Sequence, residues 1–321
     1  MKHFVVLNPR HLYSKSNIER AYSYIETAFK ALGDVDYELY TSRFPRDAVG
    51  AIKEYCGGGE KTRVYAAGGD GILFDCLNGV AGCENVELTA IPYGGGANDF
   101  LRDFGDDAVP MFRDLKLLYD AVPVPVDIFS CNANYAINYC GIGIEGDASL
   151  FTEFIMNLTK KRVALLKNYL RYTYGLGAFF AFFKKNICEK QYRIIIDGSD
   201  YSGIYAGVFI ANGSCFGCNK ISSLRAMVDD GVLNVILAKS ADLFTLMRCW
   251  PAFQNGSPEK HPDIFTEVRA KKISIWPEDD CLEICLDGEP MRDSFLEIKV
   301  IPRGIQFAIP QKLAAIERGI L

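Results

Sequence analysis

Histidine is scarce in this sequence of 321 residues, where it occurs only as His3, His11 and His261. So few histidines argue against a histidine-based catalytic triad. Basic residues are also in deficit, because 35 lysines and arginines face 40 aspartates and glutamates, giving a formal net charge of -5. A chain with this balance has no overall positive field to attract nucleic acid, so we expect no nucleic-acid partner. Any attraction to an anionic surface must be local.

Long apolar runs are missing as well. The most apolar window, Gly175 to Phe183, is much shorter than the roughly 18 residues that span a bilayer. The N-terminal apolar run of four residues is too short for a secretory signal peptide. The 11 cysteines are odd in number and scattered, which favours reduced thiols. These absences predict a cytoplasmic protein, associated at most peripherally with the inner membrane face.

Two regions of different pattern follow one another along the chain. The first 127 residues alternate strand-like runs (4–7, 35–41, 64–67, 88–92) with helical spacing (15–32, 45–55, 72–80). Repeated βα units predict a mainly parallel sheet with helices on both faces. After about residue 122, strand-like runs separated by Gly, Asp or Asn turns dominate. We therefore predict an α/β nucleotide-binding domain at 1–127, joined by the C-terminal segment 306–321, and a β-sandwich-like domain at 128–305.

A helical insertion at 151–190 is predicted to interrupt the β-rich domain. Residues 151–193 contain nine basic and two acidic residues, a local charge of nine minus two, or +7, and phenylalanines lie among them. Basic and aromatic side chains together suit docking on an anionic lipid surface. The alternative is a core helix with buried phenylalanines and solvated lysines. The sequence leaves both interpretations open.

A glycine turn, Gly68-Gly69-Asp70-Gly71, stands between a predicted strand and a predicted helix. Glycines allow close backbone approach, so that successive N–H groups point at one anion, and the helix N-terminus adds its positive dipole end. A carboxylate in such a turn suits a Mg²⁺ ion or a hydroxyl group. The alternative is an ordinary βα turn capped by Asp70. No G-x-x-x-x-G-K-[ST] pattern is present, so the turn is not a P-loop.

A second turn, Gly94-Gly95-Gly96, follows one βα unit later and leads into Asn98 and Asp99. Because the carboxyl ends of parallel strands meet at one sheet edge, both turns are expected to lie together there. Two glycine turns, each with an aspartate, predict a site for phosphate and metal. Asn98 or Asp99 as a plain helix N-cap is the alternative.

These motifs resemble those of the diacylglycerol kinase catalytic family, whose superfold is shared by NAD kinases. The first turn, with Asn78-Gly79, resembles its G-G-D-G-T…N-G motif, and residues 92–100 resemble P-x-G-T-x-N-D-F. The opening N-P, the D-D-G-x-L segment and the late D-G-E have counterparts in Asn8-Pro9, Asp229 to Leu233, and Asp287 to Glu289. The matches run in family order from residue 8 to 289.

The resemblance implies a role for each matched residue. Glu289 would be the general base, and Asp70 and Asp99 would organise a catalytic Mg²⁺ and the phosphates. A structural Mg²⁺ would be bound by Asp230 and the backbone carbonyls of Met227 and Val232. ATP would be contacted by Asn8, Thr41, Gly68, Gly69, Asp70, Gly71, Asp75, Gly95, Gly96 and Asn98.

The sequence departs from the family pattern at several polar positions. Ile72 replaces the threonine after G-G-D-G, Asp75 replaces a glutamate, and the second turn has glycines instead of a threonine, with one extra residue.

The resemblance implies an ATP- and Mg²⁺-dependent kinase with a lipid substrate at a membrane surface, and a site in the cleft between the domains. A NAD kinase-like enzyme and a non-catalytic lipid- or nucleotide-binding homologue remain alternatives. The oligomeric state stays open, a homodimer included.

Overall fold

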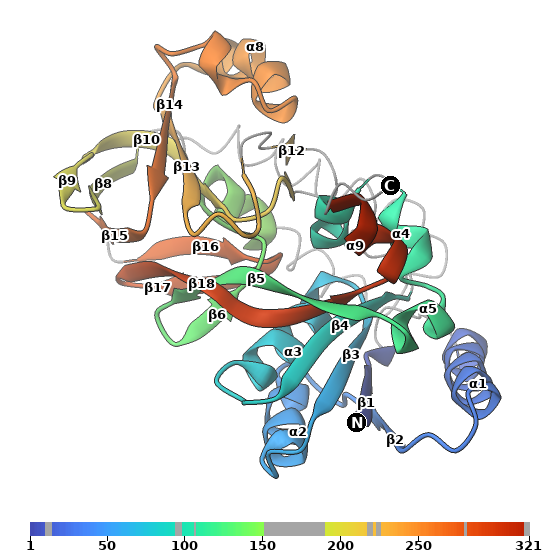
Figure 1. The fold of residues 1–321 in the computed structure, drawn as a ribbon. Coiled ribbons are helices and arrows are strands. Elements are labelled where there is room, and N and C mark those ends of the chain that lie inside the picture. Colours follow the sequence, from blue (N-terminus) through green and yellow to red (C-terminus); the bar gives the residue numbers. More distant parts are fainter. Residues whose placement is uncertain are drawn as a thin grey trace.

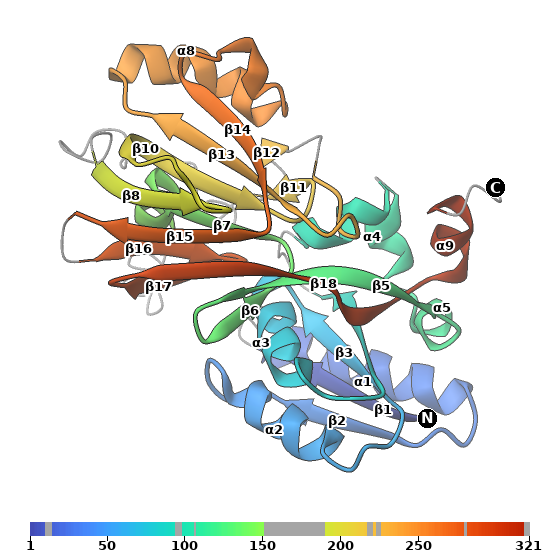
Figure 2. The ribbon, with the colours of Figure 1, turned by 60° about the vertical axis from the view of Figure 1, so that its left-hand side comes forward.

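The computed structural model describes residues 1–9, 15–93, 98–105, 107–150, 190–216, 221–222, 226–278 and 281–317. The chain forms an α/β part from about its first 120 residues and a β-rich part from most of the remainder (Figure 1). In Figure 2 the α/β part lies below the β-rich part, and β5 (Val122–Cys131) and β18 (Leu296–Ile309) run between the two.

The α/β part is built on four parallel strands in the order β2-β1-β3-β4. These strands are β1 (Lys2–Leu7), β2 (Tyr37–Thr41), β3 (Thr62–Gly68) and β4 (Val86–Pro92). The helices between them are α1 (Lys15–Ala31), α2 (Asp47–Cys56) and α3 (Asp70–Val80). After β4 come η2 (Asp99–Phe104), α4 (Ala108–Met111) and α5 (Leu115–Tyr119). β3 is buried along its whole length, as expected for a strand covered on both faces, and the predicted parallel sheet is confirmed.

The β-rich part is antiparallel, with the strand order β17-β16-β7-β10-β8-β15-β18. Its strands are β6 (Asn134–Ala136), β7 (Tyr139–Gly143), β8 (Lys190–Ile196), β9 (Ser199–Asp200), β10 (Gly203–Ala211), β11 (Cys215–Phe216), β12 (Ile221–Ser222), β13 (Leu233–Lys239), β14 (Phe265–Ala270), β15 (Lys272–Pro277), β16 (Leu282–Leu286) and β17 (Glu289–Asp293). The remaining helices are α8 (Leu243–Gln254), η4 (Pro258–Lys260) and α9 (Gln311–Glu317).

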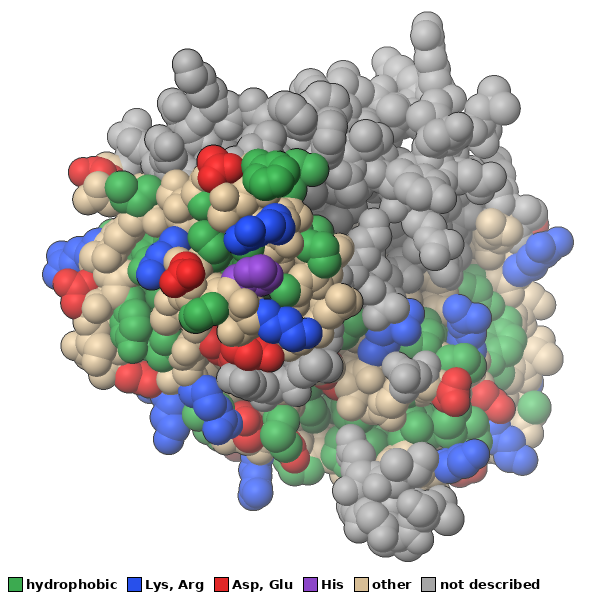
Figure 3. All heavy atoms as spheres, turned by 90° about the horizontal axis from the view of Figure 1, so that it is seen from above, with side chains coloured by type: hydrophobic (Ala, Val, Ile, Leu, Met, Phe, Trp, Pro, Cys, Tyr) green, Lys and Arg blue, Asp and Glu red, His purple; other side chains and the backbone are tan. Residues whose placement is uncertain are grey.

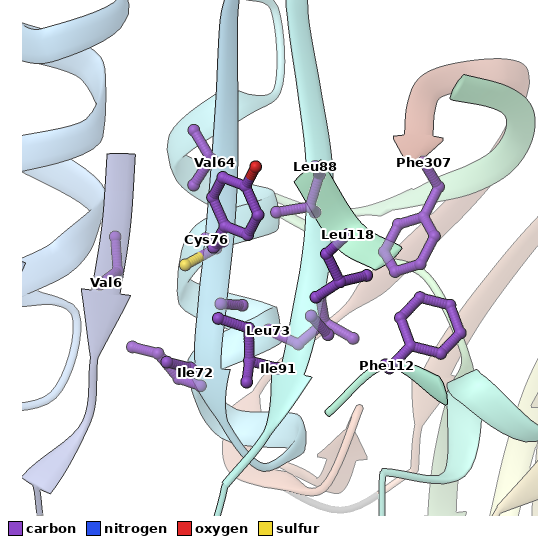
Figure 4. Packing of buried hydrophobic residues seen from close by; sticks show 14 of the residues in the cluster. Val6, Val64, Ile72, Leu73, Cys76, Leu88, Ile91, Phe112, Leu118 and Phe307 are labelled. Carbon is purple, nitrogen blue, oxygen red and sulfur yellow. The ribbon is translucent and has the colours of Figure 1, made fainter. Parts of the chain in front are cut away.

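Strand β18 belongs to both parts. Residues 296 to 299 pair antiparallel with β15, whereas Gln306 and Phe307 pair parallel with β4. In the α/β core the Phe307 ring stacks on Phe104, with centroids 5.7 Å apart, and it faces Phe112 (Figure 4). The end of the chain therefore completes the core of the first domain.

Helix α3 also contacts both parts. Ile72 and Leu73 point into the α/β core (Figure 4). Phe74, only 1% exposed, instead packs into the core of the β-rich part with side chains such as Phe129 and Leu286. The helix that begins in the first glycine turn is therefore fixed by two hydrophobic cores.

The structure differs from the sequence-based expectation in three places. Residues 268–276, which read as one strand-like run in the sequence, belong to two strands, because the N–H groups of Lys271 and Lys272 turn away to bind the Asp197 carboxylate. Helix α2 begins at Asp47 instead of Pro45, because Arg46 adopts a left-handed conformation with φ 68°. Helix α8 was not expected. Residues 151–189 of the predicted insertion lie outside the described residues.

The surface of the described part mixes charges of both signs. Figure 3, which views the molecule from above relative to Figure 1, shows basic, acidic and hydrophobic side chains interspersed. The phenyl ring of Phe244 on α8 is 77% exposed, and Met247 one turn later is 57% exposed. No helix of the described residues is long and apolar enough to cross a membrane.

Candidate active site

The first group of predicted residues lies at the carboxyl edge of the parallel sheet. In the strand register Leu7 is level with Thr41 and Ala67, and Gly68 is level with Pro92. Asn8 follows directly, and its N–H donates to the carbonyl of Ala67 at 3.1 Å. The structure therefore brings Asn8, Thr41 and the first glycine turn to one edge. The Thr41 hydroxyl contacts the hydroxyl of Tyr22 there.

Asp70 joins the first glycine turn to the start of η2. It is the first residue of α3, and Gly69 is the N-cap residue of that helix. The Asp70 carboxylate accepts the backbone N–H of Asn98 at 3.0 Å and that of Asp99 at 3.2 Å. These bonds hold the start of η2 against the start of α3. Asn98 and Asp99, which follow the predicted second turn, are therefore brought to the first turn, while residues 94–97, Gly95 and Gly96 among them, lie outside the described residues.

Ile72, which stands where the family has threonine, is a core residue. Its side chain is 1% exposed, and its Cγ2 would lie only 2.7 Å from a Cβ placed on Gly68. The isoleucine fills the inside of the turn and presents no polar group. A phosphate at this turn would therefore be bound by backbone N–H groups, which are the donors of such turns.

Glu289 reaches this turn from the β-rich part. It is the first residue of β17, and the two-residue connection Asp287-Gly288 has positive φ at both positions, 49° and 87°. This is the geometry of a tight type I′ hairpin. A Cβ placed on Gly71 would collide with Oε1 of Glu289. The carboxylate therefore lies directly over the second residue of α3, and only glycine leaves space for it.

Asp287 anchors that hairpin. Its side chain is buried and accepts three backbone N–H groups, from Ile137 at 2.8 Å, Asn138 at 3.0 Å and Tyr139 at 2.8 Å. These donors precede and begin β7, the neighbour of β16. The position of Glu289 is thus fixed by the residue two places before it. The sequence indicated the D-G turn but gave no sign of this anchor.

Two carboxylates near the contact between the α/β part and the β-rich part, Asp70 and Asp287, have raised pKa values. Burial raises the pKa of Asp70 to about 6, against the opposing effect of the Asn98 and Asp99 N–H groups. Burial also raises the pKa of Asp287 to about 7, and the charge of Asp70 adds to the effect. Both pKa shifts come mainly from burial, which disfavours the ionised carboxylate, and a nearby cation such as Mg²⁺ would favour it.

The carboxylates at this sheet edge suit a Mg²⁺ ion only when it is bound together with phosphate. Among the described residues no three acidic, histidine or cysteine groups lie close enough to hold a metal by themselves. Mg²⁺ commonly takes one or two carboxylates and completes its shell with phosphate oxygens and water. Asp70 and Asp99 suit this arrangement, because they begin two adjoining helices at the strand ends.

Asp75 lies in the next turn of α3 and faces α2. Its carboxylate accepts the Arg46 N–H at 3.0 Å, and the Arg46 guanidinium is 3.8 Å away. The same guanidinium donates to Asn134 of the β5–β6 hairpin at 2.9 Å and lies over the Phe74 ring. In this arrangement Asp75 fixes the residues before α2. Sequence reasoning missed Arg46, whose positive φ has no sequence signature.

The third predicted site, at Asp230, has a different environment. One carboxylate oxygen of Asp230 pairs with the Arg269 guanidinium, and the other accepts the Val232 N–H at 3.2 Å. Met227 is exposed nearby in sequence. Because the Arg269 guanidinium already neutralises the Asp230 carboxylate, this arrangement does not fit a metal cation held by Asp230.

We predict that Gly71→Ala lowers activity while preserving the fold. The new Cβ meets the far end of a flexible side chain, so the Glu289 carboxylate moves away instead of the backbone. A displacement of about 1 Å at a reacting group can cost roughly 10²-fold in rate. Steady-state kinetics and melting temperature of the variant test this.

Gly50→Ala on α2 is the matched control, because nothing lies within 4 Å of its Cβ position. It should keep full activity and gain up to about 1 kcal/mol of stability; equal kinetics for the two variants would contradict the prediction.

A second prediction concerns Glu145, which follows β7 and is 3% exposed. Burial raises its pKa from 4.5 to about 7, although the Tyr139 hydroxyl donates to it at 3.3 Å. Because the folded-state pKa is the higher one, this group's stabilisation is complete below pH 4.5 and is lost as pH rises through 7. Glu145→Gln should raise the free energy of unfolding at pH 8 by up to ~3 kcal/mol. The variant should also show a smaller increase in stability than wild type as the pH falls. Denaturant unfolding from pH 4 to 8 measures this, with exposed Glu297→Gln as control; equal slopes for wild type and Glu145→Gln would show that the prediction is wrong.

Two family models match the chain in the order of its two structural parts. The diacylglycerol kinase catalytic domain matches residues 2–131, and the YegS C-terminal NAD kinase beta sandwich-like domain matches residues 153–309. The two matches cover the α/β part and the β-rich part in turn, and together they support a protein of the lipid kinase class. The chain therefore contains a diacylglycerol kinase catalytic domain followed by a YegS C-terminal domain.

Curated relatives and a solved structure agree with this assignment. The chain is 28% identical over 257 residues to the "Probable lipid kinase YegS-like" of Shewanella frigidimarina (strain NCIMB 400), covering 77% of this chain and 76% of the relative. It is 25% identical over 229 residues to the diacylglycerol kinase of Bacillus subtilis (strain 168), covering 70% of each. A crystal structure of a diacylglycerol kinase from Bacillus anthracis str. Sterne has the same fold, with a TM-score of 0.68, 22% identity and 96% coverage of each chain.

Proposed function

We propose that the protein is an ATP-dependent kinase that phosphorylates the hydroxyl group of a diacylglycerol-like lipid at a membrane surface. The observation that carries this proposal is the position of Glu289 over Gly71. It brings a carboxylate from the β-rich part onto the glycine turn of the α/β part. Phosphoryl transfer depends mainly on positioning and charge stabilisation, and this geometry supplies a proton acceptor beside a phosphate-binding turn.

In this proposal the α/β part binds ATP. The N–H groups at the start of α3 point toward the phosphates, and the helix dipole favours their negative charge. Asp70 keeps the start of η2 against the first glycine turn through its bonds to Asn98 and Asp99. Mg²⁺, when bound with the phosphates beside Asp70 and Asp99, would neutralise their charge.

The transfer step uses Glu289 as the base. The lipid hydroxyl oxygen forms a bond to the γ-phosphorus while the bond from that phosphorus to the β–γ bridging oxygen breaks. ADP leaves, and the hydroxyl proton passes to the Glu289 carboxylate. Asp287 holds the hairpin so that this carboxylate stays over the turn.

Two alternatives remain to be separated by experiment. A NAD kinase-like enzyme shares the superfold, and a non-catalytic homologue would bind lipid or nucleotide without turnover. The burial of Ile72 keeps the turn packed without the threonine hydroxyl, a feature that an enzyme and a binding protein would share. Purified protein should be incubated with radiolabelled ATP and Mg²⁺ against diacylglycerol, other hydroxyl-bearing lipids and NAD. Labelled lipid supports the proposal; labelled NAD, or ATP binding with no labelled product, supports one of the alternatives.

A further inference from the structure

The loop from Ala226 to Val232, which leads into β13, is held by an arginine. Asp230 presents both carboxylate oxygens to protein groups: one pairs with the Arg269 guanidinium and the other accepts the Val232 N–H at 3.2 Å. The Asp230 side chain is only 14% exposed, whereas that of Arg269 is 61% exposed. A mostly buried carboxylate is therefore neutralised by a cation that belongs to the chain itself.

The register of two strands brings Arg269 to this loop. In the antiparallel pair β13–β14, Asn234 is level with Arg269 and Leu233 with Ala270. Asp230 lies just before β13, so the long arginine side chain spans the start of the strand to reach it. The amide of Asn234 bonds to Glu267 at 3.1 Å, which holds the neighbouring part of β14 in place. Arginine is always charged and offers a fork of donors that suits a carboxylate.

A second carboxylate in the same place is also satisfied by the protein. Asp127 on β5 is fully buried and accepts the Gly231 N–H and the Arg303 N–H, each at 2.6 Å. The backbone N–H of Asp127 in turn donates to the Val228 carbonyl at 2.6 Å. The loop is thus tied to β5 on one side and to β14 on the other through groups of the chain alone.

We propose that Arg269 takes the place of a bound divalent cation at Asp230, so that the 226–232 loop keeps its structure without metal. A cation on the Asp230 carboxylate would stand beside a fixed positive charge and would have to displace it. The family resemblance implied Mg²⁺ at this position, and this chain carries an internal substitute. This role of Arg269 affects the stability of the 226–232 loop and is independent of catalysis.

If Arg269 stands in for a metal ion, removing its side chain should allow Mg²⁺ to bind at Asp230. Wild type, Arg269→Ala, Asp230→Ala and the double variant are melted without nucleotide, in MgCl2 and in NaCl of equal ionic strength. Wild type should show no Mg²⁺ response that depends on Asp230. Arg269→Ala should melt at a lower temperature in NaCl and regain about 2 °C or more in MgCl2. The double variant should lose this response, and calorimetric titration with Mg²⁺ should show one additional site only in Arg269→Ala.

Arg292→Ala is the matched control, because Arg292 is an equally exposed strand arginine that pairs with Glu283. It should gain no Mg²⁺ response. If Arg269→Ala is too unstable to purify, Arg269→Gln, which keeps donors but not charge, replaces it in every comparison. A Mg²⁺ response in wild type that Asp230→Ala abolishes would overturn the proposal. So would an arginine variant without any gain in Mg²⁺ response.

Discussion

Replacing Glu289 by glutamine is expected to lower lipid phosphorylation by roughly 10²-fold or more while leaving ATP affinity close to that of wild type. Glutamine keeps the size of the side chain over Gly71 but cannot accept the hydroxyl proton. ATP affinity should persist, because the nucleotide is assigned to the strand ends of the α/β part. Both quantities are measured on one preparation, nucleotide affinity by calorimetry and product formation with an accepted lipid.

The matched control is Glu297→Gln on β18, a half-exposed glutamate paired with Lys272. It should change neither quantity. Loss of both ATP affinity and turnover in Glu289→Gln would assign Glu289 to the stability of the β16–β17 hairpin. Retention of both would mean that the proton leaves by another route.

Replacing Asp70 by asparagine is expected to remove almost all turnover while the protein stays folded. The change removes the negative charge assigned to Mg²⁺ and the phosphates. It also turns an NH2 group toward one of the two backbone donors, Asn98 or Asp99. An unsatisfied N–H there should cost about 1–3 kcal/mol of stability. Activity assays and denaturant unfolding measure the two effects separately.

Asp114→Asn provides the comparison for this variant. Asp114 also accepts two backbone N–H groups at a helix start, from Lys116 and Leu117, but it caps α5. It should keep full activity with a small change in stability. Asp70→Asn activity within about threefold of wild type, a difference of less than ~1 kcal/mol in transition-state stabilisation, would remove Asp70 from the proposed mechanism.

The elements with a strong local pattern could be predicted from the sequence. The buried strands β1, β3 and β4 are short apolar runs bounded by turns, and the Asp287-Gly288 pair indicates a hairpin. Both glycine turns were expected at one sheet edge, since parallel strands end together there. Helix α8 was missed although Asp242 caps it by accepting the Thr245 N–H at 3.0 Å, a signal present in the sequence.

The contacts between distant residues could not be predicted. Asp230 and Arg269 are 39 positions apart and meet only through the register of β13 and β14. The three bonds that anchor Asp287 come from residues about 150 positions earlier in the chain. A sequence pattern reports local periodicity, whereas these contacts depend on how separate strands align.

The burial of Phe74 limits how the two halves of this protein can be separated. The Phe74 ring packs in the hydrophobic core of the β-rich part, although its helix α3 belongs to the α/β part. A fragment that ended after β5 would expose it to water and would lose the strand that pairs with β4, because that strand is contributed by β18. The boundary between the two matched family models is therefore not a place where the chain can be cut into two independently folding parts. The α/β part depends on the β-rich part for the strand beside β4 and for the packing of Phe74, so a shortened version must keep residues from both parts.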